Sequence, residues 1–219
     1  MERPMGAAKA VQGSFRGLGA LMLIRWLRVF LSACVMTWAM PVHAADVVGR
    51  TTALRPLATQ TAPRNQPVPL GLNAPIFLFS ALQTAPTGAL QVTFVDNSQL
   101  SMGPASLVVV DQYMFAGPGS GSRQVVRYAK GAFRFVSGAM PRDRVQIETP
   151  SVSIGIRGTV LRTLVTEDGT TTVGVDDGNI FVTSKQTGQT ITLSPGEKIT
   201  IKPSGEFGAV TLGKVEGCP

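Results

Sequence analysis

Residues 145–165 read VQIETPSVSIGIRGTVLRTLV, and this stretch decides the fold class. Apolar side chains alternate with polar or small ones on both sides of the Thr149-Pro150 step. Alternation with a period of two is the pattern of a half-buried β-strand, and the many β-branched residues here also favour strands. The stretch therefore predicts short β-strands rather than a helix.

The same pattern extends over residues 88–201. Turn-forming clusters separate the apolar runs: Asp96-Asn97-Ser98, Asp176-Asp177-Gly178-Asn179 and Ser194-Pro195-Gly196-Glu197. Strands recur about every 8–12 residues, which is the interval of a sandwich, a barrel or a solenoid. We expect a single all-β domain, either a β-helix-like solenoid or roll, or a β-sandwich. The short strands of similar length favour stacked coils.

Residues 1–44 have the layout of a secretory signal. Basic residues precede the apolar run Val29–Met40, and Val42 and Ala44 stand at −3 and −1 of a cleavage position. The apolar run has 12 residues, whereas a helix needs about 20 to span a bilayer. We expect a helical signal segment cleaved near Ala44 and a periplasmic or secreted mature chain. The alternatives are an uncleaved membrane anchor and a lipid anchor on Cys34.

Removal of the signal lowers the formal net charge from +7 to +3. The remaining chain is expected to divide into a linker with an entering strand (45–73), a β domain (74–202) and a C-terminal tail (203–219). One cysteine remains, Cys218, so no internal disulfide can support the fold. A hydrophobic core must therefore stabilise the domain.

The residue types of most catalytic sites are missing from the mature chain. The one histidine, His43, lies in the signal, whereas nucleophilic triads and histidine-ligated metal sites need an imidazole. Asp176 and Asp177 are expected to form a turn rather than a pair of glycosidase carboxylates. The glycine-rich run 117–122 lacks the Gly-Lys-Ser/Thr ending of a phosphate-binding loop. We expect no enzymatic activity, no cofactor and no metal.

One band of the mature chain is distinctly basic. It contains Arg123, Arg127, Lys130, Arg134, Arg142 and Arg144. Apolar residues interleave these cations, whereas a nucleic-acid-binding protein clusters them on one face, so no nucleic acid is expected as a partner. The cations suit solvated strand edges, where charge discourages edge pairing. The other interpretation is a face that binds a partner, and we call this set the predicted basic face.

The block from Ala74 to Ile201 resembles the FecR domain family, named for the ferric-citrate signalling regulator. The matching stretches are TGALQVTFVDNSQL (87–100), KGAFRFVSG (130–138), ETPSVSIGIRGT (148–159), VDDGNIFV (175–182) and LSPGE (193–197). The motif positions expected to have structural roles are Gly131, Phe133, Phe135, Thr149, Pro150, Gly155, Arg157, Gly158, Thr159, Gly178 and Gly196. Gly131, Gly158, Gly178 and Gly196 are expected at turns or strand starts, with positive φ or close backbone approach.

The resemblance implies an extracytoplasmic all-β domain without catalysis. In iron-uptake regulators this domain receives a signal from an outer-membrane transporter and passes it to a cytoplasmic sigma factor. Such regulators have an N-terminal cytoplasmic domain, whereas only 28 residues precede the apolar run here, so the β domain is expected to stand alone. We expect a periplasmic module that binds a protein partner in envelope signalling. The alternatives are a glycan or peptidoglycan binder and a membrane-anchored anti-sigma-type regulator.

Overall fold

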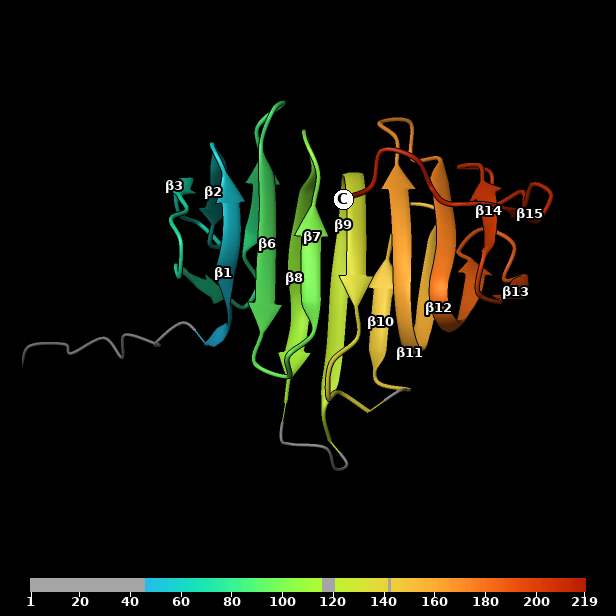
Figure 1. The fold of residues 1–219 in the computed structure, drawn as a ribbon, viewed down its shortest axis with the longest axis horizontal. Helices are drawn as coiled ribbons and strands as arrows, with labels where there is room; N and C mark the ends of the chain where they lie inside the picture. Colours follow the sequence, from blue (N-terminus) through green and yellow to red (C-terminus); the bar gives the residue numbers. More distant parts are fainter. Residues whose placement is uncertain (1–45, 116–120, 142) are drawn as a thin grey trace, which may run out of the picture. The chain divides into compact units, whose positions relative to one another are not determined.

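The computed structural model describes residues 46–115, 121–141 and 143–219, and these residues are all β (Figure 1). Within these ranges no helix qualifies as a bilayer-spanning segment. The predicted signal segment 1–44 and its cleavage position lie outside the described residues, as does Arg142. The all-β prediction is confirmed for the described part of the chain.

The described residues form one open, mixed sheet of 15 strands. The strands are β1 (Val47–Arg55), β2 (Ala58–Thr61), β3 (Val68–Pro69), β4 (Pro75–Phe77), β5 (Ala81–Thr84), β6 (Ala89–Phe94), β7 (Gln99–Met102), β8 (Leu107–Met114), β9 (Arg123–Val136), β10 (Val145–Glu148), β11 (Val152–Val165), β12 (Thr171–Ser184), β13 (Thr190–Leu193), β14 (Glu197–Ile201) and β15 (Thr211–Leu212). Among these strands the pairing of β9 with β10 is parallel and the others are antiparallel.

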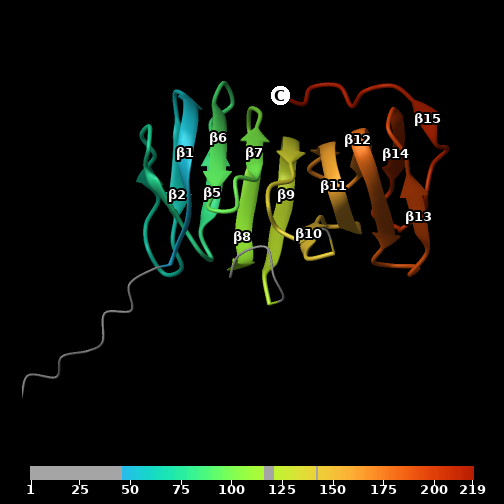
Figure 2. The ribbon, with the colours of Figure 1, turned by 60° about the horizontal axis from the view of Figure 1, so that its bottom comes forward.

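The sheet is folded into two layers, which Figures 1 and 2 show from two sides. Layer A contains, in order, β1, β6, β7, β9, β11, β12, β14 and β15, with β4 beside β1. Layer B contains, in order, β2, β5, β8, β9, β10, β11, β12 and β13, with β3 beside β2. The two layers face each other as in a sandwich. Strands that follow one another in sequence are added one after another along the layers, as in a solenoid. The antiparallel pairing differs from the parallel coils of a β-helix.

Three long strands, β9, β11 and β12, belong to both layers because each bends at a glycine near its middle. The glycines are Gly131, Gly158 and Gly178, with φ angles of 112°, 63° and 77°. Residues with a Cβ are strained at such angles, so glycine is favoured at all three bends. The register between β11 and β12 also shifts around Val160, which adds a bulge to the bend.

The expected tight turn at Asp176–Asn179 is wrong. β12 runs without interruption from Thr171 to Ser184 and passes through these residues. Gly178 supplies the positive φ that the turn prediction required, but the angle bends the strand toward the other layer and does not reverse the chain. Gly196, by contrast, lies in the turn between β13 and β14 with a φ of 84°, as expected.

The core lies between the two layers. Alternate residues of each strand point into it, as Leu90, Val92 and Phe94 of β6 illustrate. Tyr128 and Phe133 lie on either side of the β9 bend, and their stacked rings have centroids 4.1 Å apart. Both rings are fully buried, so the bend at Gly131 is packed from the inside.

The segments on either side of the predicted β domain also contribute to the sheet. Residues 46–73 hold β1, β2 and β3, and β1 pairs with β6 from Gly49 to Arg55. The C-terminal segment crosses layer A, where Val215 is buried against Gly174. The Cys218 thiol donates a hydrogen bond to the backbone oxygen of Thr163 at 3.4 Å, and burial raises its pKa. The domain boundaries themselves stay predictions.

Substitution of the β12 bend glycine tests the bend directly. A Cβ at Gly178 would lie 2.2 Å from the Gly158 backbone oxygen, whereas a Cβ at Gly188, with a similar φ of 72°, would meet no atom within 4 Å. Gly188→Ala therefore costs only backbone strain, about 1 kcal/mol. Gly178→Ala adds a clash with backbone and is expected to cost about 3–5 kcal/mol in denaturant unfolding. Equal losses for the two variants would contradict the bend.

Candidate functional site

A groove lies on the outer face of layer B, over β10, β11 and β12. Two adjoining hollows of about 500 and 400 Å³ meet at Gly155 and share the side chain of Phe181 as a wall. Gly155 forms an open floor, since the nearest atom to a Cβ placed there would be Phe181 Cβ at 3.9 Å. We call this the Gly155 groove. The residues that line it are Arg123, Asp143, Arg144, Val145, Gln146, Ser153, Gly155, Ile156, Arg157, Phe181 and Thr183.

Strand register arranges the lining residues in rows across the strands. The middle row consists of Gln146, Gly155 and Phe181, on β10, β11 and β12. Phe181 is 43% exposed, which is unusual for a large aromatic side chain on a sheet face. The groove therefore combines bare backbone with an exposed ring, a surface suited to an apolar group of a ligand.

Three arginines form the next row toward one end of the groove. The register that pairs Gln124 with Val145 places Arg123 beside Arg144, and the register of β10 with β11 places Arg157 opposite Arg144. The Gln124 backbone N–H donates a hydrogen bond to the Arg144 oxygen at 2.8 Å, which supports this alignment. Adjacent strands are about 4.8 Å apart, so the row spans about 10 Å.

This arginine row has little compensating negative charge. Arg144 pairs with Asp143 at 3.3 Å, but both side chains are largely exposed, so the pair contributes little. Arg123 and Arg157 have no ion pair with any described residue. Like charges opposite one another on neighbouring strands destabilise a sheet by about 0.2–1 kcal/mol. The row is thus unfavourable for the isolated domain and favourable for an anionic ligand.

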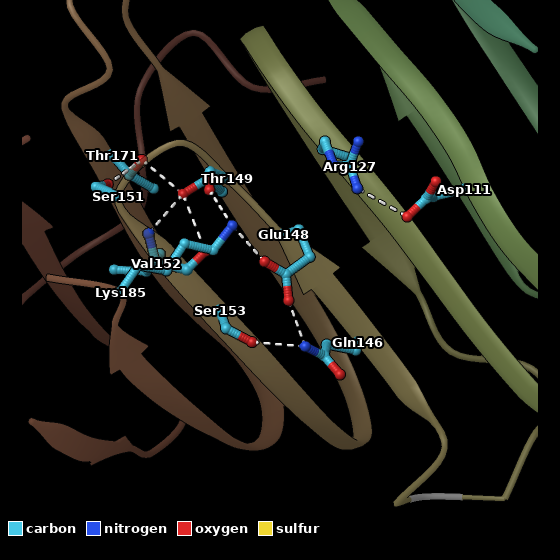
Figure 3. Close-up of polar contacts among 10 residues, drawn as sticks. All are labelled: Asp111, Arg127, Gln146, Glu148, Thr149, Ser151, Val152, Ser153, Thr171 and Lys185. Atoms are coloured by element: carbon cyan, nitrogen blue, oxygen red, sulfur yellow. Dashed lines mark hydrogen bonds and ion pairs between the residues drawn. The ribbon is translucent and has the colours of Figure 1, made fainter. Parts of the chain in front are cut away.

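A neutralised hydrogen-bond network closes the other end of the groove (Figure 3). Gln146 donates hydrogen bonds to Ser153, at 2.8 Å, and to Glu148, which also pairs with Lys185. Burial opposes the charge on Glu148, but the Lys185 ammonium and the hydrogen bonds from Ser153 and Gln146 outweigh it and lower the pKa of this carboxyl. Glu148 therefore stays ionised and paired, and the positive charge of the groove is concentrated at the arginine row.

The structure distributes the predicted basic face over several surfaces. Arg123 and Arg144 lie in the Gly155 groove. Arg127 pairs with Asp111 at 2.8 Å on layer B (Figure 3), Lys130 pairs with Glu167 at 3.0 Å, and Arg134 lies on layer A opposite Arg162. Arg142 lies outside the described residues. Of the described residues of the predicted basic face, Arg123 and Arg144 therefore lie in the groove, and the other three lie elsewhere on the sheet.

Arg157, like Gly155, is a groove residue to which the family resemblance gave a structural role. Its alternation with Gly155 on β11 was a signal that both share one face of the strand. Its proximity to Arg123 and Arg144 depends on the pairing of three strands, which no local pattern indicates. The exposed Phe181 was likewise part of a matching stretch and was not singled out.

Apart from Gly155 and Arg157, the motif positions lie in the core, at bends or in turns. Phe133 and Phe135 are fully buried. Thr149, which precedes Pro150, accepts a hydrogen bond from the Val152 N–H at 3.0 Å and another from Thr171 at 3.0 Å (Figure 3). Thr159 donates to the Asn179 oxygen at 3.0 Å, beside the Gly158 and Gly178 bends. These contacts give the Thr-Pro and Gly-Thr positions structural roles.

The described residues contain no group of three or more His, Cys, Asp or Glu side chains that could hold a metal. Asp143 is the one acid among the residues that line the Gly155 groove, and it faces Arg144. A single exposed acid beside arginines can accept hydrogen bonds but forms no acid–base pair.

Comparisons with known proteins give one family and one fold. The family model described as FecR protein matches residues 80–181. A crystal structure of a "putative anti-sigma factor" from Parabacteroides distasonis aligns with a TM-score of 0.50 and 17% identity, over 61% of this chain and 60% of that chain. A second crystal structure of a protein so described, from the same organism, gives a TM-score of 0.49, 16% identity and the same coverage. No curated protein matches the chain.

At this identity the structural likeness concerns the fold. The aligned part spans about three fifths of the Parabacteroides distasonis chain, as it does of this one. The likeness therefore agrees with the all-β layers described above. The family match is narrower and covers β5 to Phe181 of β12, the part that contains all three bends and the residues of the Gly155 groove other than Thr183.

Repulsion within the arginine row predicts an unusual stability effect. Arg157→Ser is expected to stabilise the domain against thermal unfolding at low salt, by roughly 0.2–1 kcal/mol, because it removes a like charge opposite Arg144. The gain should vanish when salt rises from about 0.01 M to about 1 M, since the screening length falls from about 30 Å to about 3 Å. Arg50→Ser, at an exposed cation on β1, serves as the control and should show no such gain. A loss of stability at low salt for Arg157→Ser would refute the repulsion.

Proposed function

We propose that this chain, whose residues 80–181 match the family model described as FecR protein, is a non-catalytic signalling module that binds a protein partner in the cell envelope. The Gly155 groove is the docking site. Arg123 and Arg157 supply charge for recognition, and Phe181 supplies apolar contact. The observation that carries the proposal is the arginine row, in which two of three cations have no acidic partner among the described residues.

The composition of the groove supports a protein partner. Arginine and aromatic side chains are enriched at the energetically important positions of protein–protein interfaces. The groove is concave, lies on a continuous sheet face and adjoins no cluster of acid, base and nucleophile. A glycan would stack on exposed aromatic rings, and both tyrosines of the chain, Tyr113 and Tyr128, are buried, so the groove offers the ring of Phe181 and no tyrosine for such stacking.

The regulatory part of the proposal rests on family and fold. The family model that matches residues 80–181 is described as FecR protein, and the Parabacteroides distasonis protein that shares the fold is described as a "putative anti-sigma factor". The envelope location rests on the secretory pattern of residues 1–44. A membrane-anchored regulator would have the same groove and would differ in keeping this N-terminal segment.

Site-specific photocrosslinking in the native host tests the docking site. A photoreactive amino acid at Thr183, a groove residue on β12, is expected to give a discrete protein adduct. The double change Arg123→Glu with Arg157→Glu should abolish the adduct, because it reverses the charge that attracts the partner. Arg50→Glu, the matched charge reversal on β1, should leave the adduct unchanged.

A second crosslinking position, on the other layer, tests whether the adduct is specific to the groove. Thr172 lies on layer A, where its hydroxyl is 2.9 Å from that of Thr200, and a photoreactive residue there should give no such adduct. An adduct from Thr172 alone, or an adduct from Thr183 that survives both arginine reversals, would rule out the groove. Absence of any protein adduct, with glycan recovered instead, would rule out a protein partner.

A further inference from the structure

Resting on the proposed function, we infer that the Gly155 groove recognises an extended segment of the partner in which an acidic residue at position i is followed by an apolar residue at i+2. The acidic side chain binds the arginine row. The apolar side chain fills the hollow over Gly155 and contacts Phe181. This names the chemical class of the partner's docking segment, which the family match does not supply.

The groove runs along the strands. The hollow of about 400 Å³ contacts Arg123 and Arg144 at one end, Gly155 and Phe181 in the middle, and Thr183 at the other end. These residues belong to three successive outward-facing rows of the sheet. A ligand that fills the hollow therefore lies along β11 and crosses the rows one after another.

The spacing of the rows matches an extended peptide. Outward-facing rows are two residues apart, and a strand rises about 3.3 Å per residue, so the arginine row and the Gly155 row are roughly 7 Å apart. Side chains at i and i+2 of an extended peptide point to the same side and repeat at the same interval. An acid over the arginines thus places the side chain at i+2 over Gly155.

The chemistry of each row decides the residue type. Arg123 and Arg157 are exposed guanidinium groups on either side of Arg144, and planar guanidinium groups suit the carboxylate of Asp or Glu. In the middle row Gly155 has no Cβ and the ring of Phe181 is exposed, so an apolar side chain has space over Gly155 and a ring to contact, with Gln146 on the other side. In the next row Ser153 already accepts a hydrogen bond from Gln146, and Glu148 is paired with Lys185, so that end demands no charge from the ligand.

Recognition at this site must come from side chains and not from strand addition. β10 pairs with both β9 and β11, and β11 pairs with both β10 and β12 along the groove. Their backbone N–H and C=O groups are therefore already used by the sheet. Edge-strand augmentation, the usual way in which sheets bind extended peptides, is not available here.

Calorimetric titration of the purified full-length chain with synthetic peptides tests the inference. The probe is a capped nine-residue Ser/Gly peptide with Asp at i and Leu at i+2. Two control peptides are used: the first has the same composition as the probe, and the second has side chains of the same shape. One control moves Leu to i+1, and the other replaces Asp with Asn. The probe is expected to bind about tenfold more tightly than either control, as one well-made charged contact allows.

Variants of the chain locate the binding. Arg157→Ser should weaken the probe about tenfold, whereas Arg50→Ser should leave binding unchanged. Unchanged thermal unfolding, or the expected stabilisation, shows that Arg157→Ser is folded. The inference would be overturned if the i+1 control bound as tightly as the probe, or if Arg157→Ser left the affinity for the probe unchanged. It would also be overturned if a glycan that carries no peptide displaced the probe.

The proposed docking site and the proposed i, i+2 motif can be refuted independently of each other. If the Thr183 adduct depends on Arg123 and Arg157 but the peptide spacing has no effect, the protein-binding groove stands and the i, i+2 motif is wrong. If the adduct is also independent of the arginines, both are wrong.

Discussion

The close packing of two glycine bends determines where the binding face lies. Gly158 of β11 and Gly178 of β12 are so near that a Cβ on the latter would lie 2.2 Å from the backbone oxygen of the former. The two strands therefore change layer at the same level. Just beyond the bends the register pairs Arg157 with Asn179 and Gly155 with Phe181. The groove is built on the first residues of layer B after the crossing, so its geometry follows from the bends.

The bend in β9 has a different consequence, because it separates cations that are close in sequence. Gly131 has a φ of 112°, and a Cβ there would lie 2.1 Å from the Ser106 hydroxyl oxygen. Arg127 precedes the bend and belongs to layer B, whereas Arg134 follows it and belongs to layer A. A basic stretch that looks continuous in sequence thus becomes two faces. The cations that do meet, Arg123, Arg144 and Arg157, come from three different strands or strand ends.

The features that the sequence could predict are those that depend on residues close together in the chain. Alternation predicted the strands, and the turns at Asp96–Ser98 and Ser194–Glu197 are confirmed because their residues act within a few positions. Asp176–Asn179 has the same turn chemistry, but neighbours distant in sequence made it a bend. The arginine row depends on the register of β9, β10 and β11, which a single strand does not encode. The distribution over layers, and hence the site, could not be deduced before the pairing was known.

The central claim is that the hollow over Gly155, flanked by the arginine row, receives the partner. Filling the hollow tests this most directly, because Gly155 has an ordinary strand conformation and open space where a side chain would go. Gly155→Val leaves every charge in place and suits a strand. The account predicts that thermal stability of this variant is unchanged or higher while the Thr183 crosslink to the partner disappears. A stable Gly155→Val protein that still gives the crosslink would contradict the account.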